Sequence, residues 1–182
     1  MTMASITSTA STTSTMKKLA LVAALFAAGT GAANAADEII RHRIPNSTFP
    51  ISAAVEIPSS FTNVYLSGQV PPLQDATAPK NSAAAYGGDT KGQTVGVLKA
   101  IEKSLTGLGL TMGDVVKMQV FLVGDPAKDN KMDFAGFMEG YTQFFGTTAQ
   151  PRLPVRSAMQ VAALANPAYL VEIEVMAVRP AK

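Results

Sequence analysis

The chain has 182 residues, of which 47% are hydrophobic and 15% are charged, and it contains neither Cys nor Trp. This hydrophobic content excludes a mainly disordered protein, and the lack of an apolar run of about 20 residues excludes a polytopic membrane protein. The absence of Cys excludes disulfides, thiolate metal sites and cysteine nucleophiles. The formal charge of +2 depends on the N-terminal segment.

Residues 1–35 are predicted to be an N-terminal extension followed by a secretory signal peptide. Residues 1–15 hold ten Ser or Thr and no charge, and Lys17 and Lys18 then precede an apolar stretch at 19–28. The sequence Ala-Asn-Ala at 33–35 fits the small-residue cleavage motif, so cleavage is expected after Ala35 and the protein is expected in the periplasm or outside the cell. An organellar transit peptide is the alternative, because the segment is rich in Ser and Thr and has no acidic residue.

The mature chain, residues 36–182, is predicted to form a single domain. Loss of Lys17 and Lys18 leaves 13 basic residues against 13 acidic ones, so the mature chain is formally neutral. A neutral domain lacks the basic field that binding to nucleic acid or to an anionic membrane normally needs. We therefore expect no nucleic-acid partner and no stable membrane association after cleavage.

The mature chain has the pattern of three strands, a helix, a strand, a second helix and two final strands. Such an order is typical of an α+β fold in which two helices cover one face of a mixed sheet. Residues 70–88 form a long connection without periodicity. The expected strands are 39–44, 51–57, 63–66, 115–123, 155–163 and 169–178. The first helix is expected from Asp89-Thr90, with apolar positions at Val97, Leu98, Ile101, Leu105 and Leu108; the second is expected from Asp129-Asn130, with Phe134, Phe137, Met138, Tyr141 and Phe145.

The last two strands carry the charged residues that could bind a ligand. Strand alternation places Arg156, Ala158 and Gln160 on one face, and it places Glu172 and Glu174 on the face away from the helices. Arg156 is the best candidate for binding a carboxylate, because its planar fork forms two parallel hydrogen bonds. An ion pair with one of the two glutamates is the alternative. Glu172 could position or deprotonate a water. Charges flanked by apolar residues indicate a face covered by a partner subunit, although an exposed polar sheet face remains the alternative.

Other catalytic patterns are absent. A Ser-His-Asp triad would need His42, the only histidine, which lies close to the start of the mature chain. Asp125, Asp129 and Asp133 lack the spacing of a calcium loop and are predicted to be turn and cap residues. No metal site is expected. The aromatic residues of the second helix are predicted to be core residues.

Four motifs resemble those of the Rid family, the reactive intermediate deaminases also called YjgF proteins. They are Val-Tyr-Leu-Ser-Gly-Gln-Val-Pro at 64–71, Asp-Val-Val-Lys at 114–117, Pro-Val-Arg-Ser at 154–157, and Val-Glu-Ile-Glu-Val-Met-Ala at 171–177. The resemblance extends over about residues 50–179. It implies a chorismate-mutase-like (YjgF-type) fold, a homotrimer with clefts between subunits, and hydrolysis of 2-imino acids to 2-keto acids and ammonia without cofactors.

The resemblance also implies roles for individual residues. Arg156 matches the arginine that grips the substrate carboxylate, and Glu172 matches the glutamate that orients the attacking water. Ser67 and Gly68 match the turn that lines the pocket, and Ala158 holds the position whose backbone amide faces the ligand. Met138 stands where Asn is common.

The early segment Phe-Pro-Ile-Ser at 49–52 lacks the usual Tyr, so the pocket is expected to be more apolar at one end. With Arg156 and Glu172 about 10 Å or more apart in either strand order, both groups are expected to meet one ligand only from different chains. A non-catalytic trimer that binds small carboxylates or proteins is the alternative function. Ribonuclease activity fits a neutral exported chain poorly.

Overall fold

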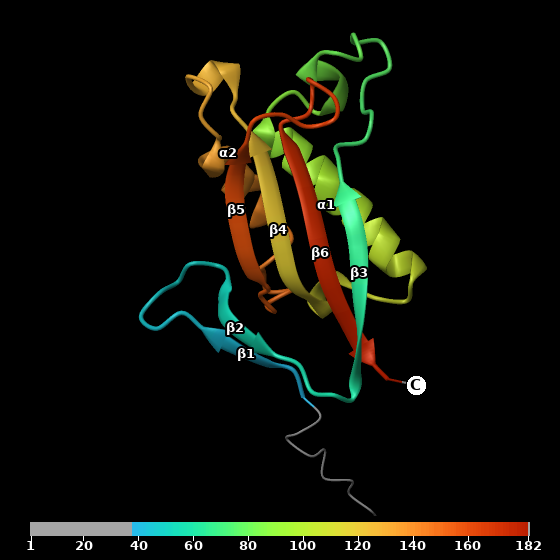
Figure 1. The fold of residues 1–182 in the computed structure, drawn as a ribbon, viewed down its shortest axis with the longest axis vertical. Coiled ribbons are helices and arrows are strands. Elements are labelled where there is room, and N and C mark those ends of the chain that lie inside the picture. Colours follow the sequence, from blue (N-terminus) through green and yellow to red (C-terminus); the bar gives the residue numbers. More distant parts are fainter. Residues whose placement is uncertain (1–37, 182) are drawn as a thin grey trace, which may run out of the picture. The chain divides into compact units, whose positions relative to one another are not determined.

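The computed structural model describes residues 38–181, so the predicted signal peptide lies outside the described residues. Within them the elements follow the predicted order (Figure 1). The α-helices are α1 (Thr90–Gly107) and α2 (Phe134–Tyr141). The strands are β1 (Ile40–Arg43), β2 (Ser52–Glu56), β3 (Phe61–Gln69), β4 (Val115–Val123), β5 (Val155–Val161) and β6 (Val171–Pro180).

The main sheet has four strands in the order β3-β6-β4-β5, and both helices lie behind it in Figure 1. β4 and β5 are parallel, whereas the other neighbours are antiparallel, so the sheet is mixed. This confirms the predicted α+β fold. One detail differs: β1 and β2 pair with each other in a separate two-stranded sheet and do not extend the main one.

Helix α1 forms as the sequence predicts. The Asp89 side chain accepts a hydrogen bond from the Gly92 N–H at 2.7 Å, which caps the first turn. Val97, Leu98, Ile101 and Leu105 are fully buried against the sheet. Leu108, expected in the same stripe, is 45% exposed, because the helix has already ended at Gly107.

The predicted start of the second helix is wrong. Asp129 and Asn130 have φ values of 57° and 55°, which is the left-handed region and cannot begin a right-handed helix. The helix begins instead at Phe134, where the Asp133 side chain accepts a hydrogen bond from the Gly136 N–H at 3.0 Å. α2 is therefore short, and Phe145 lies beyond it although it is buried as expected.

The end of β3 also differs from expectation. The segment Ser67-Gly68-Gln69 is not a turn, because β3 continues to Gln69. Leu66 pairs with Val175 and Gln69 with Ile173, so two residues of β3 lie opposite one residue of β6. This is a β-bulge, which bends the strand and redirects the Ser67 side chain.

The long connection between β3 and α1 is attached to the rest of the domain. The Gln74 and Asp75 N–H groups both donate to the Ala85 carbonyl, and the Tyr86 ring packs edge-on against Tyr169 at 4.9 Å between centroids. No helix within residues 38–181 combines the length and the apolar character needed to cross a membrane.

Candidate functional site

The two strongest candidate residues lie on opposite faces of the main sheet. Arg156 of β5 is level with Met118 of β4, whose side chain is fully buried beneath the helices. Glu172 of β6 is level with Phe121, which points to the other face because side chains alternate along a strand. The alternative of an ion pair between Arg156 and a glutamate of β6 is therefore wrong. Ion pairs among the described residues join His42 to Glu56, Lys91 to Glu139 and Arg152 to Asp114.

The Arg156 guanidinium is enclosed by aromatic rings on the helix-covered face. Its central carbon lies 4.3 Å from the ring centroid of Tyr141, 4.9 Å from that of Phe137, 5.5 Å from that of Phe49 and 5.8 Å from that of Phe134. Aromatic faces attract cations, so the rings offset part of the cost of burying this charge. Burial lowers the pKa of Arg156, whereas the neighbouring Tyr141 hydroxyl acts in the opposite direction.

The hydrogen bonds of Arg156 are incomplete. Nη2 donates to the Met138 sulfur at 3.2 Å, but Nη1 is buried and has no partner among the described residues. A thioether sulfur is a weak acceptor, and buried donors are normally paired. A carboxylate placed here would accept a charge-assisted hydrogen bond from Nη1.

The aromatic enclosure is built by α2 and by the loop between β1 and β2. Phe134, Phe137 and Tyr141 lie along one face of α2, at the spacing that makes residues neighbours on a helix. The Tyr141 hydroxyl donates to the Pro50 carbonyl at 2.8 Å, which holds the adjacent Phe49 near Arg156. The prediction that the helix aromatics are core residues is confirmed, but their second role around Arg156 was missed. No local pattern marks Phe49 as a neighbour of Arg156.

The predicted site residues form two groups. The Arg156 group comprises Arg156, Met138 in contact with it, and Ala158 two residues further along the same face of β5. The Glu172 group comprises Glu172 with Ser67 and Gly68 at the bulge of β3. A Cβ atom on Gly68 would collide with the Glu172 carboxylate, so only glycine allows this close approach. One chain does not bring the two groups together.

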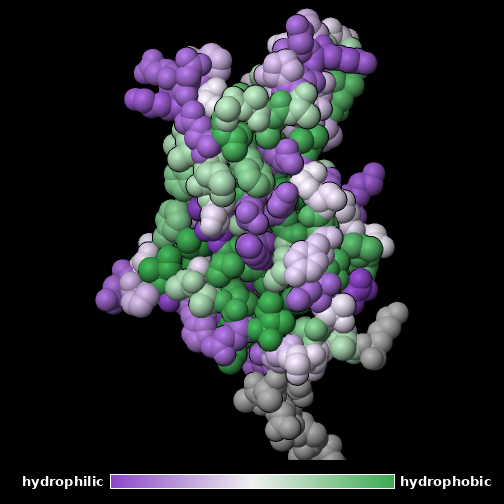
Figure 2. Space-filling view, viewed as in Figure 1, coloured by the Kyte–Doolittle hydropathy of each residue, from purple (hydrophilic) through white to green (hydrophobic). Residues whose placement is uncertain are grey.

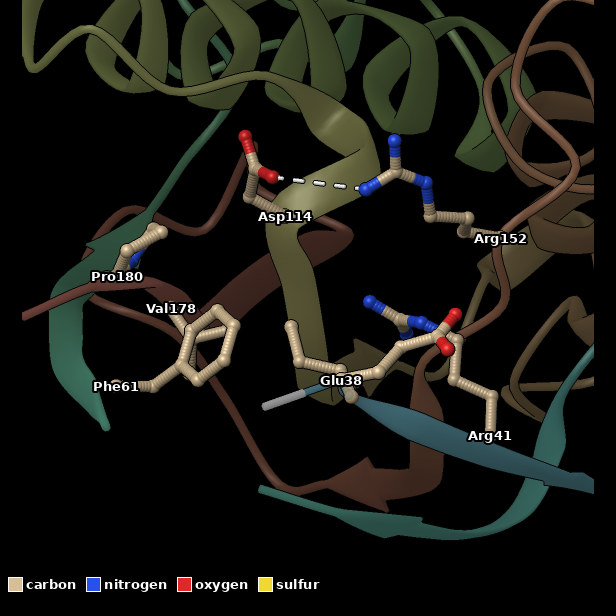
Figure 3. A pocket seen from close by; sticks show the side chains of 8 residues that line it. Glu38, Arg41, Phe61, Asp114, Arg152, Val178 and Pro180 are labelled. Atoms are coloured by element: carbon tan, nitrogen blue, oxygen red, sulfur yellow. Dashed lines mark ion pairs between the residues drawn. The ribbon is translucent and has the colours of Figure 1, made fainter. Parts of the chain in front are cut away.

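A cavity of about 700 Å³ lies elsewhere in the domain and is shown in Figure 3. Its two arginines are already engaged. Arg41 donates to the carbonyl oxygens of Val115, Leu153 and Gly113, and Arg152 faces Asp114 at 3.8 Å. A smaller cavity of about 390 Å³ borders Arg156 itself.

Other sequence predictions about chemistry concern His42 and the aspartates. His42 lies in the β1–β2 hairpin, where its Nε2 is 2.6 Å from Glu56. Asp125 and Asp133 cap short helices, as expected. Within the described part of the chain, no three side chains of His, Cys, Asp or Glu are grouped so that they could hold a metal ion.

Comparison with known proteins identifies the family. The profile of the family described as endoribonuclease L-PSP matches residues 43–179. TdcF of Escherichia coli K12, named as a reactive intermediate deaminase, is 33% identical over 139 residues, covering 76% of this chain and 94% of TdcF. The chain belongs to the Rid family.

Further relatives agree with this assignment to the Rid family. A RutC family protein of Pyrococcus horikoshii is 32% identical over 139 residues, again covering 76% of this chain and 94% of the relative. The crystal structure of the Rid family protein YyfB of Yersinia pestis, described as of unknown function, superposes with a TM-score of 0.56 at 26% identity, over 77% of this chain and 96% of that one. That of E. coli TdcF with bound serine superposes with a TM-score of 0.50 at 32% identity, over 78% and 97%. Names within the family refer both to deamination and to ribonuclease activity.

Proposed function

We propose that this Rid protein hydrolyses reactive 2-imino acids to 2-keto acids and ammonia, without a metal or an organic cofactor. The observation that carries the proposal is the unpartnered, buried Nη1 of Arg156. A 2-imino acid has a carboxylate next to its reactive carbon, so a group that binds the carboxylate also positions the imine. Orientation of this kind lowers the barrier to attack by water.

Arg156 would bind the carboxylate, and the backbone at Ala158 would lie beside the imine carbon. The aromatic rings exclude water from the guanidinium, which strengthens the hydrogen bond to a charged acceptor. Because Met138 occupies one edge of the guanidinium, the carboxylate would reach Arg156 chiefly through Nη1.

Glu172 would act on the water. As the water oxygen bonds to the carbon of the protonated imine, the Glu172 carboxylate accepts one proton, and a carbinolamine forms. Glu172 then returns this proton to the amine nitrogen, and the C–N bond breaks. The hydroxyl proton leaves with ammonia as ammonium, so the keto acid forms and Glu172 is regenerated. Protonated imines are already electrophilic, and positioned acid–base groups contribute about 10²–10⁴-fold to such steps.

The proposal requires two copies of the chain, because Arg156 and Glu172 point away from each other in one copy. Arg156 and Ala158 lie on β5, an edge strand, and the Glu172 group lies on the sheet face that the helices leave open. This open face carries hydrophobic side chains among hydrophilic ones (Figure 2). Strand pairing places Tyr65, which is 74% exposed, opposite Met176, and it places Met159, which is 37% exposed, opposite Phe121 on this face. We propose that the protein is exported and assembles as a homotrimer. In this trimer the open face of one chain packs against the β5 edge of a neighbour, which brings the Arg156 group and the Glu172 group into one cleft.

The experiment generates imines in situ with an amino-acid oxidase and follows keto-acid release by the full chain. Arg156→Ala should abolish both acceleration and keto-acid binding, whereas Glu172→Gln should abolish acceleration and leave binding intact. No acceleration with any small, branched or aromatic imine would contradict the deaminase. If the wild type binds keto acids under those conditions, the protein is a non-catalytic module for small carboxylates.

A further inference from the structure

The side chains that contact the Arg156 guanidinium offer no free polar group that could recognise a polar part of a substrate. The Tyr141 hydroxyl already donates to the Pro50 carbonyl. Gln160, next after Ala158 on the same face of β5, accepts from the Met132 N–H at 2.9 Å and donates to the Asn130 carbonyl at 3.0 Å. Arg156 is therefore the only described group on this face of β5 with an uncommitted buried donor.

The surfaces next to the guanidinium are apolar and partly open. Phe49 is 40% exposed although its ring lies over Arg156, and Phe134, Met138 and Ala158 are partly buried. The cavity of about 390 Å³ that borders Arg156 has a mixed lining, apolar at Ile44, Ile51 and Val155 and polar at Ser52, Lys117 and Ser157. A ligand whose carboxylate reaches Nη1 would meet the carbon atoms of Phe49, Phe134 and Met138 next to the guanidinium.

We propose that the substrates are 2-imino acids with a large apolar side chain, such as those derived from leucine or phenylalanine, and that Phe49 and Met138 determine this specificity. The inference rests on the proposed function, since Arg156 must hold the carboxylate. Apolar walls favour each additional methylene of a ligand by about 10- to 200-fold when it is buried. A hydroxyl held against the Arg156 side of the cleft would lose water without gaining a partner there.

The experiment compares imines derived from leucine, phenylalanine and serine, and separately measures binding of 4-methyl-2-oxopentanoate and pyruvate to the full chain. We expect kcat/KM to be at least about 10-fold higher for the leucine imine than for the serine imine, and the branched keto acid to bind at least about 10-fold more tightly than pyruvate. Met138→Gln, which keeps the length of the side chain but adds an amide, should reduce both ratios. Phe49→Ser should do the same.

Leu108→Gln is the matched control, because Leu108 is an exposed apolar residue at the end of α1 and should leave both ratios unchanged. Equal kcat/KM values for leucine and serine imines would overturn the inference while leaving the deaminase in place. Selective binding of the branched keto acid without turnover would instead contradict the proposed deaminase activity and support the preference for ligands with an apolar side chain. If Met138→Gln and Phe49→Ser leave both ratios unchanged, Met138 and Phe49 do not determine the substrate specificity.

Discussion

Arg156 and Glu172 extend from opposite faces of the same sheet, with β4 lying between their strands. The sheet itself therefore separates the guanidinium from the carboxylate, and no rotamer of either side chain brings them to one small molecule. Each residue has its own neighbours: aromatic rings and Met138 around Arg156, and the Gly68 bulge beside Glu172.

This separation predicts complementation between two inactive variants. Arg156→Ala and Glu172→Gln should each abolish imine hydrolysis, but an equimolar mixture that is unfolded and reassembled should recover it. Each cleft needs Arg156 from one chain and Glu172 from a neighbour, so random assembly of a symmetric oligomer should restore about one quarter of the wild-type activity. Keto-acid release from in situ imines gives the measurement. A mixture with no more activity than either variant alone would contradict a site shared between chains.

Replacing Arg156 by Met should stabilise the fold while removing ligand binding. Arg156 is buried with an unpartnered N–H, and replacing a buried charge by an apolar side chain of similar volume is often stabilising. We expect the free energy of unfolding to rise by about 1 kcal/mol and keto-acid binding to be lost. Urea unfolding and titration calorimetry provide the measurements, with exposed Arg43→Met as the control. A marked loss of stability would show that the contacts with the aromatic rings more than offset the free-energy cost of burying the charge.

Much of the fold could be predicted because the apolar periodicities are strong. The apolar run at 115–123 predicts a buried strand, and the spacing of Val97, Leu98 and Ile101 predicts a helix with one buried face. The structure contains both. The start of α2 could not be predicted in the same way, since Asp and Asn favour both helix caps and left-handed turns. The choice between them at Asp129 depends on contacts that are distant in sequence.

The candidate site was harder to predict than the fold. Alternation along β5 and β6 shows which side chains of each strand share a face, but it does not show which face of β5 the helices cover. That depends on the parallel pairing of β4 with β5, which places Arg156 level with buried Met118. The contact of Phe49 with Arg156 joins residues more than one hundred positions apart, and no local pattern encodes it.

Gly68→Ala should impair catalysis without unfolding the protein. The added methyl group would collide with the Glu172 carboxylate, which is the end of a flexible side chain and can move aside. We expect kcat to fall at least about 10-fold, as for a displaced acid–base group, with little change in Tm. Gly107→Ala is the control, because nothing lies within 4 Å of its added methyl group. Unchanged kcat in Gly68→Ala would show that the position of the Glu172 carboxylate does not matter for turnover.

Stability should decrease at high pH because of Tyr141. Burial raises the pKa of its hydroxyl from 10.0 to about 12, so the unfolded state loses its proton first as the pH rises. The stabilising contribution is complete below pH 10 and is lost between pH 10 and pH 12, by about 2–3 kcal/mol in all. Urea unfolding across this range measures the loss, and Tyr141→Phe should show a flatter dependence. Identical slopes for the two proteins would indicate that Tyr141 does not titrate with folding.

Gln93→Leu should destabilise the connection that leads into β6. Gln93 of α1 is fully buried; its Nε2 donates to the Ala168 carbonyl at 2.8 Å, and its Oε1 accepts from the Leu170 N–H at 2.7 Å. Leucine would leave both backbone groups buried without a partner, which should cost about 2–4 kcal/mol of unfolding free energy. Because Leu170 lies two residues before Glu172, kcat should also fall, whereas keto-acid binding at Arg156 should be retained. Gln143→Leu, which removes an exposed hydrogen bond beyond α2, should change stability by less than about 0.5 kcal/mol. If the two variants unfold at the same urea concentration, the Gln93 bridge does not hold this connection in place.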